Sequence, residues 1–177
     1  MSSCLDRDNA ADDLFFVGWR QGLDRLSRRE RAHVAPATGH VAESVTESVL
    51  EPHGWSPLWH FTGPGGHGID LLFLAPNDLV VAVEVKGTLV TGRTPSLSRS
   101  QLSQMSAAWI DKADNPGMAE LGLESSDIYG GVVVVNFADL VWRMALSHNF
   151  LEFEPVEGID RLRGLDWLQL SAKAGGR

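Results

Sequence analysis

The chain alternates between stretches with apolar residues at helical spacing and short runs rich in β-branched residues. Helical spacing predicts an amphipathic helix over residues 12–31, and a second helix over residues 40–51 that follows a loop containing Pro36 and Gly39. Short apolar runs, rich in aromatic residues at 55–61 and in β-branched residues at 79–88 and 128–137, predict strands at residues 55–61, 69–75, 79–88, 128–137 and 140–146. This order predicts an α/β fold in which a mixed central β-sheet is flanked by helices.

Two of the predicted strands form a hairpin, because Pro76, Asn77 and Asp78 between them are typical turn residues. If the hairpin is centred on Asn77, Asp70 and Glu84 lie directly opposite each other. Opposed side chains on neighbouring strands have Cβ atoms about 4.5–5.5 Å apart, and two like charges placed in this way destabilise the pair. The sequence therefore predicts that another group compensates this repulsion.

Lys86 lies on the same face of its strand as Glu84, since side chains alternate along a strand, and Val83 and Val85 point toward the core. A bound Mg²⁺ ion would compensate the repulsion between the two carboxylates, because Mg²⁺ binds one or two carboxylates together with water and substrate oxygens. The backbone carbonyl of Val85 is a further oxygen ligand, and an adjacent lysine can orient or deprotonate an attacking water. The spacing alone leaves a second interpretation open, in which Lys86 neutralises both acids in a cross-strand salt bridge.

A polar loop after the hairpin leads to the pattern Ser-x-x-Gln at residues 98–101, which is typical of a helix N-terminus. The helix that it predicts runs to about Asp114 and is stopped by the Asn-Pro-Gly sequence of residues 115–117. Another helix is predicted over residues 159–173.

The Gly-Ile-Asp sequence that ends at Asp70, followed by the hairpin and the Glu-Val-Lys sequence that ends at Lys86, resembles the PD-(D/E)XK nuclease superfamily. Isoleucine stands where the superfamily name places proline, a common departure among its resolvase-like members. The resemblance covers about residues 39–114 and the strand at residues 128–137. It implies a restriction-endonuclease-like αβββαβ core within a nuclease domain of residues 39–177, preceded by an N-terminal helical extension of residues 1–38.

The resemblance implies a Mg²⁺-dependent endonuclease, with Mn²⁺ as an alternative metal. Asp70, Glu84 and the Val85 carbonyl are expected to hold the metal. Lys86 is expected to position and activate the attacking water. Many members also carry a glutamate on the first core helix, and Glu43 is expected to take that place as a catalytic residue and metal ligand.

Glu43 fits this place because it precedes Gly54, at the end of the helix, by about three turns. Glu47 is its rival on the same helix, and Glu51 is attributed to the solvent-exposed side. Gln104 lies in a segment similar to the helix that follows Glu-x-Lys in restriction-endonuclease-type toxin domains of bacterial polymorphic toxins. That similarity implies that Gln104 faces the metal site.

The net charge of −8 at pH 7 argues against a protein that coats duplex DNA through general basicity, but not against local binding. Residues 20–31 contain five arginines and two acids, and this run is either a phosphate-binding patch or a solvated helix face. Arg93, Arg99 and His67 flank the predicted site in sequence. We expect these three residues to bind nucleic acid.

The single cysteine, Cys4, excludes an internal disulfide framework and a cysteine-rich zinc cluster. The sequence has no apolar run near the roughly 20 residues of a membrane span, so we expect a cytoplasmic protein with no membrane partner. His53, His60 and His67 recur every seven residues, but they fall on a helix end, a strand and a glycine-rich loop. This spacing is therefore not interpreted as a zinc site.

Together these observations predict a metal-dependent nuclease that hydrolyses phosphodiester bonds, in DNA in preference to RNA. A bacterial toxin-type effector with a cognate protein inhibitor is one form of this hypothesis. The alternatives are a junction or repair nuclease of the resolvase type acting as a homodimer, and a non-catalytic nucleic-acid- or protein-binding module on the same fold.

Overall fold

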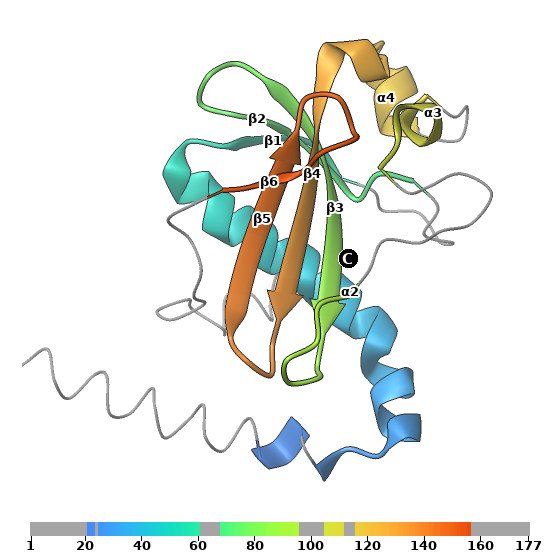
Figure 1. Cartoon of the computed structure of the whole chain (residues 1–177), viewed down its shortest axis with the longest axis vertical. Helices are drawn as coiled ribbons and strands as arrows, with labels where there is room; N and C mark the ends of the chain where they lie inside the picture. The colour runs from blue at the N-terminus through green and yellow to red at the C-terminus, as the bar shows by residue number, and fades with distance from the viewer. Residues whose placement is uncertain (1–20, 24, 61–67, 96–104, 112–115, 157–177) are drawn as a thin grey trace, which may run out of the picture.

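A six-stranded sheet of mixed strand direction forms the centre of the computed structural model, which describes residues 21–23, 25–60, 68–95, 105–111 and 116–156 (Figure 1). The strands lie side by side in chain order, which is β1 (Ser56–His60), β2 (Leu71–Leu74), β3 (Val80–Thr88), β4 (Ile128–Asn136), β5 (Val141–Ser147) and β6 (Glu154–Pro155). The β3 and β4 strands are parallel, and every other neighbouring pair is antiparallel. Within the described part of the chain, no helix combines the length and the apolar character that a membrane crossing requires.

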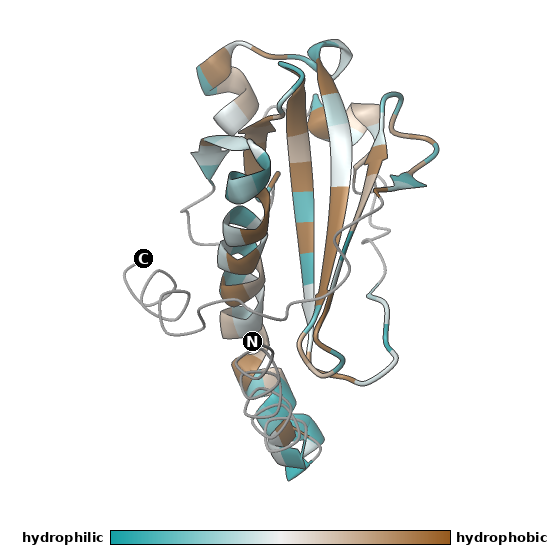
Figure 2. Ribbon diagram, turned by 90° about the vertical axis from the view of Figure 1, so that its left-hand side faces the viewer, coloured by the Kyte–Doolittle hydropathy of each residue, from teal (hydrophilic) through white to brown (hydrophobic). Residues whose placement is uncertain are grey.

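Helices pack on both faces of the sheet. The long helix α2 (Arg28–Leu50) runs along one face (Figures 1 and 2). The apolar cluster beneath it contains Ala42, Val45 and Val49 of α2 and Val81, Val83 and Val85 of β3. On the opposite face, the short helices α3 (Ala107–Ile110) and α4 (Pro116–Leu121) supply Ile110 and Met118 to a second apolar cluster that includes Leu72 and Ala82.

The predicted hairpin and the α/β fold class are confirmed. Leu74 pairs with Val80 and Leu71 pairs with Val83, so the β2–β3 register is centred on Asn77. Strands β1 to β5 each overlap one predicted strand, whereas the two-residue strand β6 is not predicted. Two short 3₁₀ helices, η1 (Glu51–His53) and η2 (Ser125–Asp127), precede β1 and β4.

The predicted loop at Pro36 and Gly39 is wrong, because α2 continues through both residues as one helix. Pro36 lacks the N–H that would bond the carbonyl of Ala32, but both residues are exposed, so water can bind that carbonyl. Gly39, at a half-buried position of the helix, costs only about 1 kcal/mol relative to alanine. The helix is stabilised on either side of these residues, by the Ser27–Glu30 cap at its start and by packing of residues 41–50 against the sheet.

The start of α2 also differs from the prediction. Ser27 caps the helix, because its Oγ accepts a hydrogen bond from the Glu30 N–H at 3.3 Å while Glu30 Oε2 accepts one from the Ser27 N–H at 2.8 Å. Preceding helical residues end at Arg25, so a continuous helix over residues 12–31 is wrong at its C-terminal end. The division between an extension and a nuclease domain stays a prediction; its boundary, between residues 38 and 39, lies within α2.

The predicted helix after the hairpin is wrong at residues 105 and 106. Met105 has a φ of +62°, and Ser106 is the N-cap of α3, with its side chain accepting from the Trp109 N–H. Pro116 begins α4 instead of stopping a helix, which agrees with the preference of proline for the first turn. The described residues do not include 96–104, 112–115 or 157–177. The capping pattern predicted at residues 98–101 and the tail helix predicted at residues 159–173 therefore lie outside them.

Candidate active site

Asp70 lies directly before β2, at the position that faces Glu84 when the β2–β3 register is extended by one pair. The main-chain ladder ends at the pair Leu71–Val83, and the N–H of Val85 donates instead to Asp70 Oδ2 at 2.7 Å. The side chain thus replaces a missing main-chain acceptor, which a buried N–H requires. This hydrogen bond places the Asp70 carboxylate beside the main chain that joins Glu84 to Lys86.

Glu84 and Lys86 lie on the face of β3 that is turned away from α2, because they alternate with valines that pack under α2. Glu84 is only 2% exposed, and its Oε1 accepts a hydrogen bond from Lys86 Nζ. A buried carboxylate requires such a partner, since the cost of removing its charge from water is several kcal/mol. Lys86 keeps about a quarter of its side chain exposed. The Lys86 ammonium group therefore lies between the buried Glu84 carboxylate and the surface of the protein.

The pKa of Asp70 is raised from 3.8 to about 6. Burial of the carboxyl group is the largest cause, and the negative charge of Glu43 raises the pKa further. The hydrogen bond from Val85 and the positive charges of Lys86 and His60 lower it. The groups that act on the Asp70 carboxyl group thus come from three elements, α2, β1 and β3.

His60 links the two glutamates that the sequence leaves as rivals on α2. Its Nδ1 lies 2.9 Å from Glu47 Oε1, and its Nε2 lies 3.1 Å from Glu43 Oε2. An imidazole donates hydrogen bonds from both nitrogens only in its charged form. Glu43 also acts electrostatically on Asp70, which favours Glu43 over Glu47 as the acid nearer to the site.

The role of His60 is not predicted from the sequence, where the residue stands out only through the seven-residue histidine spacing. Its position follows from the pairing of β1 with β2, in which His60 stands beside Leu71, the residue after Asp70. His60 and Leu71 meet only through the pairing of distant segments. The one sequence feature that could have indicated a role for His60 is therefore its place on the predicted strand before the hairpin.

The donor groups of this site fit a hard divalent cation in chemical type. Mg²⁺ takes oxygen ligands, and one or two carboxylates with water suffice for it. Asp70 and Glu84 supply carboxylates. The Val85 carbonyl points toward the same neighbouring strand as the Val85 N–H, and therefore toward Asp70. Among the described residues, no three or more His, Cys, Asp or Glu side chains form a metal-binding group, so water and substrate would complete the shell.

Of the residues predicted to bind nucleic acid, the structure describes Arg93, which lies in the loop after β3. The described residues do not include Arg99, His67 or the predicted catalytic residue Gln104. Arg93 lines a hollow of about 380 Å³ with Arg143 of β5. Because Lys86 pairs with Val134 and Val134 with Arg143, Lys86 and Arg143 share one face. Two strand spacings separate them, about 10 Å. Arg143 is not predicted from the sequence, because its place depends on the β4–β5 register.

The fold and the site define an α/β protein whose hairpin carries two carboxylates and a lysine on a mixed sheet. Comparison with protein-family models, with curated proteins and with solved structures finds no match to the chain.

Proposed function

We propose that the chain is a metal-dependent nuclease of the PD-(D/E)XK type that hydrolyses phosphodiester bonds, in DNA in preference to RNA. The observation that carries this proposal is the hydrogen bond from the Val85 N–H to Asp70 Oδ2, which holds that carboxylate beside the main chain between Glu84 and Lys86, two residues that pair with each other. The order of elements gives further support. A long helix, three antiparallel strands, a helical connection and a parallel strand follow one another, as in the αβββαβ order of that superfamily.

In the proposed reaction, Asp70, Glu84 and the Val85 carbonyl hold Mg²⁺ or Mn²⁺. When bound, the cation supplies positive charge for a phosphate oxygen and acidifies water. Lys86 donates a hydrogen bond from Nζ and orients the attacking water, because its contact with Glu84 fixes the ammonium group at the edge of the site. Glu43 assists from α2, and its contact with His60 fixes its carboxylate.

A structural salt bridge is the main alternative explanation of these residues. Lys86 forms an ion pair with Glu84, and its charge lowers the pKa of Asp70, but burial of the Asp70 carboxyl group outweighs this effect and raises the pKa to about 6. The fold therefore keeps a carboxyl group where its ionised form is unfavourable. Strong perturbation by burial together with a nearby charge is frequent at functional sites, and it favours a binding or catalytic role over a purely structural one.

The test is nicking of supercoiled plasmid DNA by the purified chain, with Mg²⁺ and with EDTA. We expect nicking only with Mg²⁺, and a loss of at least about 100-fold in Asp70→Asn and Lys86→Gln, the order of magnitude of a positioned acid–base group. Asp78→Asn is the matched control, because Asp78 is an exposed acid in the turn of the same hairpin. Wild-type nicking by the two site variants would overturn the proposal. RNA and a four-way DNA junction as parallel substrates would define the substrate class.

A further inference from the structure

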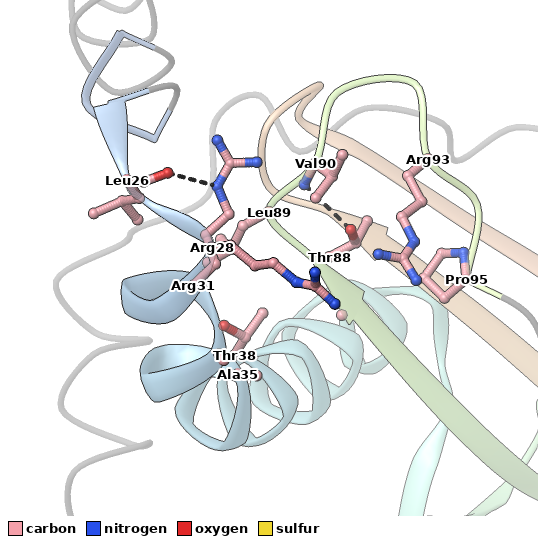
Figure 3. A pocket seen from close by; sticks show the side chains of 12 residues that line it. Leu26, Arg28, Arg31, Ala35, Thr38, Thr88, Leu89, Val90, Arg93 and Pro95 are labelled. Carbon is pink, nitrogen blue, oxygen red and sulfur yellow. Dashed lines mark hydrogen bonds between the residues drawn. The ribbon is translucent and has the colours of Figure 1, made fainter.

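A second cavity, of about 600 Å³, lies between the N-terminal half of α2 and the end of β3 (Figure 3). Its charged lining residues are three arginines, Arg28 and Arg31 of α2 and Arg93 of the loop after β3, and no acid is among the residues that line it. Ala32 and Ala35 supply small side chains to its wall. The cavity is therefore strongly positive in a chain whose net charge is −8.

The three arginines lack acidic partners among the described residues. None of them forms an ion pair with a carboxylate there. Arg31 is held in place instead by main-chain carbonyls, since it donates to Leu26 at 3.1 Å and to Leu23 at 3.3 Å. Arg28 and Arg93 are exposed and reach into the cavity from two sides (Figure 3).

Arg28 and Arg31 lie in the first turns of α2, where the acid of the first turn, Glu30, is engaged with Ser27 in the helix cap. The N-terminus of a helix carries a partial positive charge, which repels nearby cations and attracts anions. An anion in the cavity is attracted by the helix end and by the guanidinium groups together. Guanidinium groups bind phosphate through paired hydrogen bonds, so phosphate is the anion that this lining suits best.

The cavity is adjacent to the candidate active site. Gly87 and Thr88, which line it, directly follow Lys86, and a strand rises about 3.3 Å per residue. Arg93 lines both this cavity and the hollow that contains Arg143. The loop that carries Arg93 is fixed, because Asn136 Nδ2 donates to the carbonyls of Val90 and Arg93, both at 3.2 Å. The cavity lies on the α2 face of β3 and Lys86 lies on the opposite face, so a polynucleotide strand that contacts both would pass around the end of β3 at Arg93.

We infer that this cavity binds one phosphate group of the polynucleotide whose scissile phosphate lies at Lys86. The inference rests on the proposed nuclease function for the identity of the ligand. The cavity and the metal site then hold two different phosphates of the same strand.

The test is the salt dependence of binding of a fluorescein-labelled DNA duplex, measured by fluorescence anisotropy in EDTA so that no cleavage occurs. We expect Arg28→Gln and Arg93→Gln each to weaken binding by about tenfold, the effect of losing one charge-assisted hydrogen bond. The slope of log K against log salt should fall by about 0.9 for each phosphate that the variant no longer neutralises. Arg29→Gln is the matched control, because Arg29 is exposed in the same helical turn and does not line the cavity. It should leave the affinity within about twofold.

Equal affinities of Arg28→Gln and Arg29→Gln would overturn the inference, even if the plasmid assay supports the nuclease. Displacement of the duplex by micromolar inorganic phosphate or mononucleotide would also overturn it, because the cavity would then bind a free phosphate compound. If Arg28→Gln weakens binding and plasmid nicking is absent, the phosphate site stands and the nuclease proposal fails. Urea unfolding of each variant checks that the fold is retained.

Discussion

Replacing Asp70 with asparagine should stabilise the fold at neutral pH and at the same time abolish the proposed activity. The raised pKa of Asp70 means that its ionised form is unfavourable in the folded protein. An asparagine keeps an oxygen that can accept the Val85 N–H, but it carries no charge to be buried or repelled by Glu43. The substitution thus removes a cost and keeps the hydrogen bond.

The size of the effect follows from the pKa. A rise from 3.8 to about 6 corresponds to about 3 kcal/mol, since one pKa unit is about 1.36 kcal/mol. A group whose folded pKa is raised contributes stability below its unfolded pKa and loses it as the pH rises through the folded value. The free energies of unfolding of the wild type and Asp70→Asn should therefore be similar near pH 4. They should differ by up to about 3 kcal/mol above pH 7.

The assay is urea unfolding in EDTA, monitored by tryptophan fluorescence at several pH values between 4 and 8. Other titrating groups are common to both chains and cancel in the difference. Asp78→Asn is the control, because Asp78 is exposed in the hairpin turn and its φ of +61° is one that asparagine tolerates. This control should not reproduce the pH-dependent gain.

Equal stability of the wild type and Asp70→Asn at every pH would refute the reasoning. It would mean that the Asp70 carboxylate is as well solvated in the folded chain as in the unfolded chain. A loss of stability at pH 7 would also refute it, since the charged form of Asp70 would then be a stabilising partner in a salt bridge.

Two further predictions concern glycines, and urea unfolding tests both. Gly87→Ala should destabilise the fold by about 1–3 kcal/mol, because a Cβ at this position would lie 2.8 Å from the Thr38 carbonyl oxygen, where α2 crosses β3. Unchanged stability would contradict this close approach. Gly39→Ala should stabilise by about 0.5–1 kcal/mol, since it lies inside α2 and nothing is within 4 Å of the added Cβ. Destabilisation by Gly39→Ala would contradict a continuous α2.

The hairpin could be predicted from the sequence because its determinants are local. Alternating valines, turn residues around Asn77 and the spacing of Asp70 from Glu84 all lie within one short segment. Continuity of α2 could not be predicted from local propensity, since Pro36 and Gly39 both disfavour a helix, and the contacts that stabilise the following turns, from residue 41 on, are long-range contacts with the sheet. The start of α2, in contrast, has a local signal in the Ser-x-x-Glu capping pattern of residues 27–30.

The surroundings of the hairpin depend on contacts between distant segments. His60 reaches Glu43 and Glu47 only because β1 pairs with β2 while α2 packs across the sheet. Arg28 lines a cavity because α2 begins beside the loop after β3. Neither the register of distant strands nor the direction of a helix is specified by the spacing of charged residues. The carboxylates and Lys86 could therefore be predicted from the hairpin, whereas the positions of His60, Arg28 and Arg143 could not.

The central claim is that the Asp70 and Glu84 carboxylates are held together to bind a divalent cation. Calorimetric titration of Mg²⁺ and Mn²⁺ into the metal-free chain tests this claim most directly. We predict saturable metal binding by the wild type and by Asp78→Asn, and no such binding by Asp70→Asn or Glu84→Gln. Wild-type metal binding by Asp70→Asn, or no binding of either metal by the wild type, would contradict the claim.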